Sequence, residues 1–191
     1  KKPVIITEYA QKGSLDSILQ QEKSHSQHSI SNTNKLICIY GIASAMSYLH
    51  SQNVLHLDLK TGNVLVNSSF HPKISDFGLS LQLPRFGNKI KIEIRGTPSH
   101  IAPEIWRDSN YSKAADVYAF GLTVYEIMTN QIPFEDIKNI FQLIKEVVFE
   151  KNRPQFTSPI PQCYQKLIED CWNDDPENRP TFDEILSCLR K

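Results

Sequence analysis

The sequence has no net charge, no paired cysteines and no apolar run that suggests a membrane span. Its 191 residues include 21 Lys and Arg and 21 Asp and Glu, so no overall field attracts nucleic acid or an anionic membrane, and we expect neither as a partner. Its four cysteines are dispersed, with no C-x-x-C pair: Cys38, Cys163, Cys171 and Cys188. This dispersion argues against a zinc site or a disulfide framework and favours reduced thiols in a cytoplasmic protein.

Glycine is also scarce, at 7 residues, and the 11 prolines are close to the usual share, while hydrophobic residues make up 40% of the chain and charged residues 22%. This composition excludes disordered, collagenous and low-complexity proteins. A chain of this length is about one domain and can bury roughly 70% of the surface of its unfolded form. It has no recognisable signal peptide and begins with Lys1, so we expect it to be part of a longer protein.

Apolar residues at helical spacing dominate the second half of the chain. The spacing predicts helices over residues 14–19, 35–51, 114–128, 137–148, 164–172 and 182–189. The segment 114–128 is apolar on nearly every face except at Asp116 and Glu126, which predicts a buried core helix. Thr181 and Glu184 form a T-x-x-E capping box, which predicts the start of the last helix.

Short β-branched and apolar runs predict a few strands near one edge of this helical domain. The runs cover residues 4–9, 54–56, 64–66 and 73–75. Residues 22–34 are polar and predict a surface loop. Residues 79–95 have no helical period and predict a long loop, a feature that is typical of switch or binding segments in compact domains.

The densest group of polar residues among apolar ones is HLDLKTGN, residues 56–63, between two predicted strands. Asp58 offers a carboxylate that accepts a proton, Lys60 an ammonium that neutralises phosphate, and Asn63 an amide oxygen that binds a cation. Thirteen residues further on, Asp76 begins the sequence D-F-G at a strand end. Two oxygen ligands, from Asn63 and Asp76, suit Mg²⁺, which takes one or two protein ligands together with phosphate oxygens and water.

These motifs resemble the catalytic segments of eukaryotic protein kinases. HLDLKTGN is similar to the catalytic loop, residues 76–78 to the D-F-G motif, and residues 102–104 to the A-P-E motif, in the family's order. The run VIITEYAQKGSL resembles the hinge strand and the turn after it, with Thr7 as gatekeeper, and residues 116–121 resemble the buried helix that supports the catalytic loop. The chain's end, with C-W, D-P and R-P pairs between residues 171 and 180, is similar to the tyrosine-kinase-like group.

The resemblance implies an α+β fold by family that is mostly helical in this part. It covers residues 1–191 as a partial kinase domain, with the hinge strand and the C-terminal lobe but no N-terminal lobe. Lys60, and Thr97 ahead of the A-P-E motif, resemble serine/threonine kinases more than tyrosine kinases. The implied activity is transfer of the γ-phosphate of ATP to a Ser or Thr hydroxyl of a protein substrate, with Mg²⁺.

The family's roles carry over residue by residue. Asp58 would orient and deprotonate the substrate hydroxyl, and Lys60 would contact the transferred phosphoryl group. Asn63 and Asp76 would hold Mg²⁺. The resemblance also assigns adenine contacts to three residues, the backbone of Glu8 and Ala10 and the side chain of Leu65. In structural roles, Glu104 would pair with Arg179, and Asp116 would hydrogen-bond the catalytic-loop backbone.

The chain departs from the family pattern in three places. Leu57 stands where most members have an arginine that binds a phosphorylated activation loop, and residues 81–96 contain no Ser, Thr or Tyr. Both features predict activity without activation-loop phosphorylation. In addition, residues 99–101 read S-H-I where the family more often has a Tyr-Met pair, in a stretch that lines the substrate pocket.

The third departure is the absence of a glycine-rich loop, a strand lysine and that lysine's partner glutamate. The 191 residues alone are therefore expected to be inactive, because loss of one preorganised charge contact already costs on the order of 10²–10³ in rate.

The alternative is a truncated, non-catalytic kinase lobe that acts as a protein-binding module. Taken singly, Asp58 and Asp76 also have simpler explanations, as a solvated loop carboxylate and a turn residue. The motif order favours catalysis.

Overall fold

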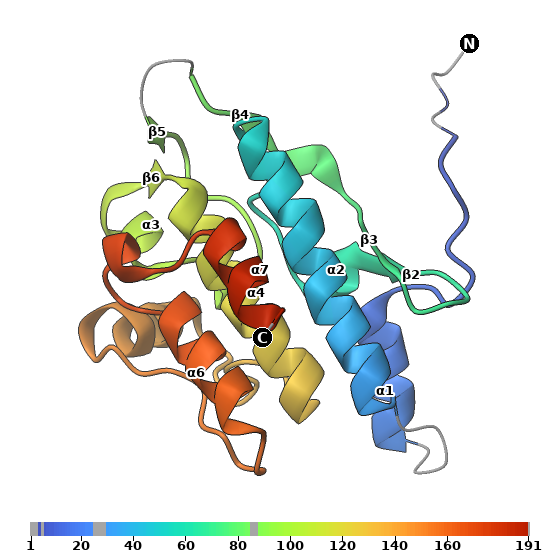
Figure 1. The fold of residues 1–191 in the computed structure, drawn as a ribbon. Helices are drawn as coiled ribbons and strands as arrows, with labels where there is room; N and C mark the ends of the chain where they lie inside the picture. The colour runs from blue at the N-terminus through green and yellow to red at the C-terminus, as the bar shows by residue number, and fades with distance from the viewer. Residues whose placement is uncertain (1–3, 5, 25–29, 85–87, 191) are drawn as a thin grey trace.

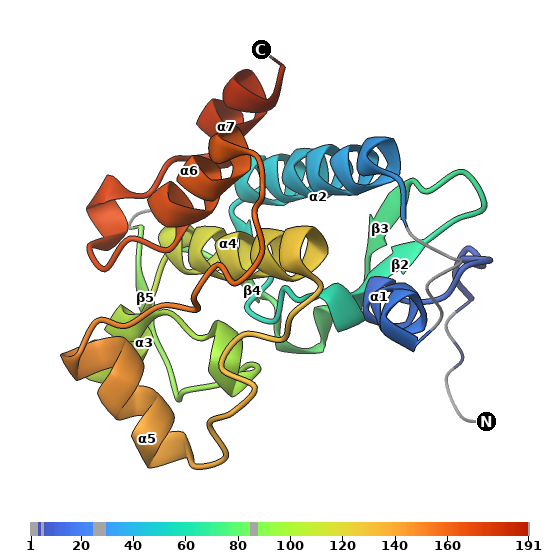
Figure 2. The same cartoon turned by 90° about the horizontal axis from the view of Figure 1, so that it is seen from below.

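The computed structural model describes residues 4, 6–24, 30–84 and 88–190. It is mostly helical, with strands of only two or three residues, as the sequence predicts. Two long helices, α2 (Asn32–Ser51) and α4 (Lys113–Thr129), lie side by side through the middle of the molecule (Figures 1 and 2). These two helices form the scaffold on which the catalytic-loop motif lies.

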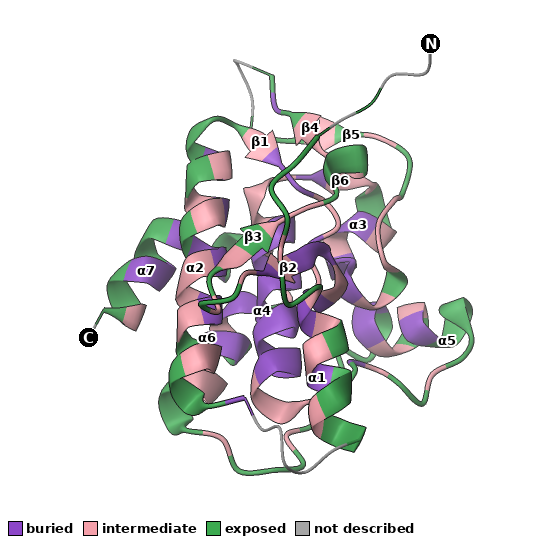
Figure 3. Cartoon of the chain, turned by 90° about the vertical axis from the view of Figure 1, so that its right-hand side faces the viewer, coloured by how far each residue is buried: buried purple, intermediate pink, exposed green. Residues whose placement is uncertain are grey.

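Helix α4 is the centre of the core. All thirteen residues from Ala115 to Ile127 are buried, and Figure 3 shows the helix enclosed by the other elements. A helix that is apolar on every face is stable only when neighbours cover it on all sides. Here α2 and α6 (Gln162–Cys171) pack against it. At Gly121 an added Cβ would lie 2.8 Å from the Cβ of Cys171, so the glycine permits the close approach of α6.

The other helices surround this pair. They are α1 (Leu15–Ser24), α3 (Pro103–Asp108), α5 (Ile140–Ile144) with a π-helical turn over Lys145–Phe149, and α7 (Phe182–Leu189). Helix α7 packs on α2, and α3 and α5 lie on the side opposite to α1 (Figure 2). The predicted capping box is confirmed, because the Thr181 hydroxyl and the Glu184 carboxylate each accept from the other's backbone N–H.

The described strands form three antiparallel pairs. They are β1 (Val54–Leu55) with β4 (Leu81–Gln82), β2 (Val64–Val66) with β3 (Pro72–Ile74), and β5 (Ile90–Lys91) with β6 (Asn110–Tyr111). The β2–β3 pair, in which Val64 faces Ile74, matters most for the site. It joins the end of the catalytic-loop motif to the start of the D-F-G motif.

Several sequence predictions need correction. The strand predicted over residues 4–9 is absent from the described residues of that segment, because they have no partner strand beside them; Ile5 lies outside the described residues. The long loop predicted over residues 79–95 contains β4 and β5, whose two-residue runs are too short for a periodic signal. The helix predicted over residues 137–148 starts at Ile140 and continues as the π-helical turn.

The predicted helix over residues 35–51 extends back to Asn32, because the Ser31 hydroxyl caps it by accepting from the Asn34 N–H. Among the described residues, no helix combines the length and the apolar character that a membrane crossing requires.

Candidate active site

The backbone of the catalytic loop is anchored to the core helix by one buried carboxylate. Asp116, 1% exposed in the first turn of α4, accepts hydrogen bonds from the backbone N–H groups of His56 and Leu57, each at 2.9 Å. Its Oδ2 also lies 2.9 Å from His50 Nε2. The predicted bond from Asp116 to the loop backbone is therefore confirmed.

This anchor holds an unusual backbone geometry. Leu57 has a φ of 68°, a left-handed conformation that costs a residue with a side chain about 1–3 kcal/mol. Hydrogen bonds from two successive N–H groups to Asp116 stabilise this turn. The turn leads directly into Asp58, the next residue of the loop.

The Asp58 carboxylate accepts hydrogen bonds on both oxygens. Its Oδ1 receives the Thr97 backbone N–H at 2.9 Å and the Thr97 hydroxyl at 2.7 Å. Its Oδ2 receives the side-chain amide of Asn63 at 2.8 Å. Three donors, two of them from a residue 39 positions further along the chain, therefore fix the orientation of this carboxylate.

Thr97 also connects Asp58 to Lys60. The Lys60 Nζ donates to the Thr97 hydroxyl oxygen at 2.7 Å and lies 3.5 Å from Asp58 Oδ2. The threonine hydroxyl thus accepts from the ammonium and donates to the carboxylate. The arrangement places a positive and a negative group side by side in one half-buried site.

Opposing effects act on the pKa of Asp58. Burial of the carboxyl acts to raise its pKa, while hydrogen bonds from Thr97 and Asn63 and the charge of Lys60 act to lower it. The lowering effects prevail, so the pKa of Asp58 lies below its usual value of 3.8. The group is ionised at neutral pH and able to accept a proton.

The β2–β3 hairpin brings Asn63 and Asp76 to the same end of two paired strands. The Ser75 backbone N–H and hydroxyl each donate to the Asn63 carbonyl at 2.9 Å, and Asp76 follows directly. Asn63 uses its side-chain nitrogen for Asp58, which leaves its amide oxygen as the atom suited to a cation. Asp76, exposed and with a φ of 61°, accepts from the Gly78 N–H at 3.2 Å.

The donor set at this hairpin fits Mg²⁺. One amide oxygen and one carboxylate are a small protein contribution, as is typical where nucleotide phosphates and water complete an octahedral shell. The described residues contain no cluster of three or more His, Cys, Asp and Glu that could hold a metal by itself. The aromatic ring of Phe77 lies edge-on to the buried His56 ring, 5.3 Å between centroids, and this contact supports the turn.

The predicted adenine contacts lie beside the same hairpin. Lys12 N donates to Val66 O at 3.0 Å, which ties the segment after Ala10 to β2. Leu65 is half-buried in the middle of β2. The Glu8 side chain is exposed and pairs with Lys73 of β3 at 2.9 Å, so its backbone lies near the hairpin. The adenine roles of Glu8, Ala10 and Leu65 stay predictions.

A buried ion pair fastens the A-P-E motif to the end of the chain. Arg179 and Glu104 form two hydrogen bonds, of 2.8 and 2.7 Å, and the Arg179 side chain is completely buried. Arg179 also donates to the carbonyls of Asn173 and Ala114. The pair predicted from the sequence is confirmed and joins α3 to the segment before α7.

Sequence reasoning did not place Thr97 in the catalytic centre, although it used this residue as a sign of serine/threonine specificity. It also missed Thr61, whose hydroxyl donates to the buried Glu126 of α4. Local sequence carries no signal for either contact, because the partners lie 37 to 65 positions apart. The G-T-P sequence before the A-P-E motif was the clue available for Thr97.

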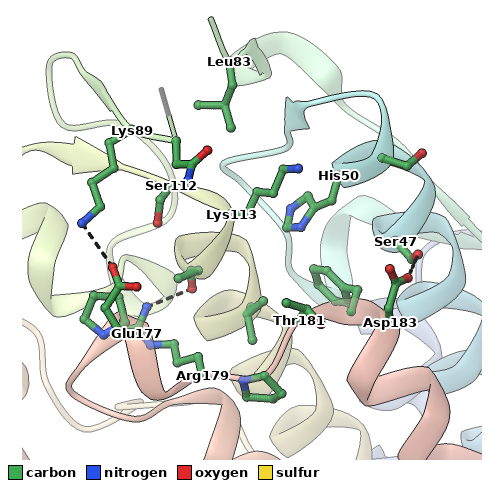
Figure 4. Close-up of a pocket in the computed structure, with 17 residues that line it drawn as sticks. Ser47, His50, Leu83, Lys89, Ser112, Lys113, Glu177, Arg179, Thr181 and Asp183 are labelled. Atoms are coloured by element: carbon green, nitrogen blue, oxygen red, sulfur yellow. Dashed lines mark hydrogen bonds and ion pairs between the residues drawn. The ribbon is translucent and has the colours of Figure 1, made fainter. Parts of the chain in front are cut away.

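A cavity of about 550 Å³ lies elsewhere, between the end of α2, the start of α4 and the segment before α7 (Figure 4). Its rim carries the Lys89–Glu177 ion pair and the Ser47–Asp183 hydrogen bond. None of the predicted catalytic, nucleotide-binding or metal-binding residues lines it. Cavity size therefore does not identify the catalytic centre in this molecule.

The helical fold, the anchored catalytic loop and the paired D-F-G hairpin define the C-terminal lobe of a protein kinase. The chain belongs to the protein tyrosine and serine/threonine kinase family, which it matches over residues 1–189. It is 35% identical over 189 residues to the serine/threonine-protein kinase CTR1 of Arabidopsis thaliana, covering 97% of this chain and 22% of that protein. It is 37% identical over 190 residues to the dual specificity protein kinase pyk3 of Dictyostelium discoideum, covering 98% of this chain and 13% of that protein. The chain therefore spans less than a quarter of either relative.

Proposed function

We propose that this chain is the catalytic lobe of an ATP-dependent protein serine/threonine kinase. The observation that carries the proposal is the hydrogen-bonded unit of Asp58, Lys60 and Thr97. It presents an oriented carboxylate beside an ammonium, as phosphoryl transfer to a hydroxyl requires. The names of the relatives, a serine/threonine and a dual specificity kinase, support the same substrate class.

In the proposed reaction, the oxygen of a substrate Ser or Thr hydroxyl forms a bond to the γ-phosphorus of ATP as the bond from that phosphorus to the bridging oxygen of ADP breaks. Asp58 accepts a hydrogen bond from the attacking hydroxyl and takes its proton. Because a carboxylate of low pKa is a weak base, its main contribution is orientation, with proton transfer late in bond formation.

Lys60 places its positive charge where the phosphoryl oxygens pass, and such preorganised charge is usually the largest contribution to catalysis. Asn63 and Asp76 would hold Mg²⁺ through their side-chain oxygens. The ion supplies charge neutralisation between the phosphate groups when it is bound. The backbone of Glu8 and Ala10, with Leu65 beneath, would bind the adenine.

Two variants of the full-length protein separate binding from transfer. Asp76→Asn removes a metal ligand and is expected to weaken Mg²⁺-dependent ATP binding, measured by calorimetry with and without Mg²⁺. Asp58→Asn keeps the hydrogen bond with Thr97 and is expected to bind Mg·ATP as the wild type does, yet to lose transfer. If wild-type protein bound no Mg·ATP, or if Asp58→Asn transferred phosphate at the wild-type rate, the proposal would be wrong.

A further inference from the structure

A second cavity, about 260 Å³ in volume, lies directly beneath the catalytic loop. Its walls come from α1, the catalytic loop, residues 97–100 and the end of α4. Five lining residues concern the argument below: Asp16, Lys60, Thr61, His100 and Glu126. The cavity therefore joins the catalytic Lys60 to two buried titratable groups that the reaction described above does not use.

Glu126 supports the catalytic loop from below. Glu126 is only 7% exposed, and its Oε2 accepts a hydrogen bond from the Thr61 hydroxyl. Thr61 begins the helical turn Thr61–Asn63 and follows Lys60 in the chain. A change at the Glu126 carboxyl thus acts through one hydrogen bond on Thr61, the first residue of the turn that links Lys60 to Asn63.

His100 lies beside the same carboxyl in the lining of the cavity. It is 6% exposed, and its Nε2 has no hydrogen-bond partner although it is buried. This atom lies 3.7 Å from Glu126 Oε1, while Nδ1 lies 3.0 Å from the Ser99 hydroxyl. An unpartnered ring nitrogen beside a carboxyl oxygen requires only a small approach to form a hydrogen bond.

Burial, modified by the surrounding charges, sets the ionisation of this pair. The pKa of Glu126 is raised to about 7, mainly by burial and also by the charge of Asp16 of α1, while the Thr61 hydrogen bonds and Lys60 act to lower it. Burial lowers the pKa of His100 to about 4, assisted by Lys60 and opposed by Asp58. Lys23 of α1 also lines the cavity. The imidazole is therefore neutral at pH 7, and the Glu126 carboxyl is about half ionised.

We propose that Glu126 and His100 form a proton-binding pair that adjusts the charge beneath Lys60, and so gives phosphoryl transfer a pH dependence separate from that of Asp58. They are positioning residues, because neither lies among the reacting groups. The proposal rests on the kinase function proposed above. His100 comes from the S-H-I segment, residues 99–101, and Glu126 comes from the core helix α4.

The proton balance is simple. In the protonated state the Glu126 carboxyl donates its proton to His100 Nε2 in a hydrogen bond, and His100 Nδ1–H donates to the Ser99 hydroxyl oxygen. On ionisation one proton leaves to solvent. The imidazole proton then resides on Nε2 and donates to the Glu126 carboxylate, and the Ser99 hydroxyl rotates to donate to Nδ1. The pair changes from neutral to a single negative charge.

This negative charge offsets part of the positive charge of Lys60. A unit charge several ångströms away in a half-buried site changes an interaction by enough to alter a rate about threefold to tenfold. Turnover is therefore expected to fall as the pH rises through about 7, the pKa of Glu126. Asp58 does not produce this fall, because its pKa is lowered and it stays ionised throughout that range.

The first test is the pH profile of kcat for the full-length protein at saturating ATP and protein substrate between about pH 5.5 and 8.5. The wild type is expected to lose about threefold to tenfold of its turnover across pH 7. Glu126→Gln, which keeps an acceptor for Thr61 but cannot ionise, is expected to show no such fall. Glu135→Gln, at an exposed carboxylate that does not line the cavity, is the matched control and should keep the wild-type profile. A fall that persists in Glu126→Gln would overturn the proposal.

The second test does not depend on activity. Infrared difference spectroscopy of the wild type against Glu126→Gln follows the protonated carboxyl of Glu126 directly as the pH changes. The proposal predicts titration near pH 7, and a shift to lower pH in Asp16→Asn, which removes the neighbouring negative charge. Titration near the usual value of 4.5, or an unmoved value in Asp16→Asn, would contradict the pair even in a protein that transfers no phosphate. Normal titration with no turnover would instead count against the kinase function.

Discussion

Thr97 is the residue on which the geometry of the catalytic loop depends most directly. Its hydroxyl is the shared atom between Lys60 and Asp58, and its backbone N–H gives Asp58 a further donor. The sequence motif of the catalytic loop was enough to predict Asp58, Lys60 and Asn63 as site residues. Thr97 lies far along the chain, and only the folded path of residues 81–97 brings it there.

Removing the Thr97 hydroxyl should therefore reduce transfer without removing a catalytic group. We expect Thr97→Ala to lower kcat about tenfold to hundredfold, because Asp58 and Lys60 lose the link that aligns them. Loss of a hydrogen bond that favours the carboxylate also raises the pKa of Asp58, so activity should be lost at a higher pH on acidification. The measurement is a kcat profile from pH 4.5 to 8.

Thr97→Ser, which keeps the hydroxyl, is the matched control. It should retain most of the wild-type activity and lose activity on acidification at the same pH as the wild type. Equal loss in both variants would show that the methyl group, and not the hydroxyl, is what matters at this position.

At the scale of elements, the buried helix and the capping box of the last helix were predictable, and the short strands were only partly so. Helix α4 was predicted because residues 114–128 are apolar on nearly every face, and the structure shows that this helix is buried. The β2 strand was found with its exact bounds. The two-residue strands β4 and β5 depend on partners distant in sequence, and the segment over residues 4–9 is apolar without forming a strand.

The buried ion pair between Glu104 and Arg179 joins elements that are distant in sequence and should contribute measurably to stability. Glu104→Gln leaves the fully buried Arg179 charge without its counter-ion. Breaking such a pair costs about 3–5 kcal/mol in the free energy of unfolding, which urea unfolding of the full-length protein would detect.

Asp170→Asn is the comparison for this prediction. Asp170 pairs with Lys166 at 3.1 Å on the exposed face of α6, where such pairs contribute about 0.3–0.5 kcal/mol. Similar losses in the two variants would mean that the buried pair contributes no more than a surface contact.

At the scale of the whole molecule, hydrogen bonds connect the described residues between 81 and 97 to the rest of the lobe. Leu83 N donates to Asn53 O at 2.8 Å, β5 pairs with β6, and the Tyr111 hydroxyl exchanges hydrogen bonds with the Arg95 backbone. Leu57, where the family more often has arginine, is half-buried against the core. These contacts are consistent with the sequence prediction of activity without activation-loop phosphorylation.

Phosphatase treatment should accordingly leave the activity unchanged within about twofold, since Leu57, and not an arginine, precedes Asp58 in the sequence. The measurement is turnover before and after treatment, with a kinase that has arginine at this position treated in parallel. A large loss of activity that returns on incubation with ATP would show that a phosphate orders this segment after all.

The central claim is that Asp58, Lys60 and Thr97 form a working phosphoryl-transfer centre. The most direct test is single-turnover transfer of the γ-phosphate from bound Mg·ATP to a serine- or threonine-containing protein, by full-length wild type and Asp58→Asn at equal nucleotide occupancy. We predict phosphoserine or phosphothreonine from the wild type and a rate about 10²- to 10⁴-fold lower in the variant. Equal rates in the two proteins, or no transfer by the wild type with Mg·ATP bound, would contradict the account.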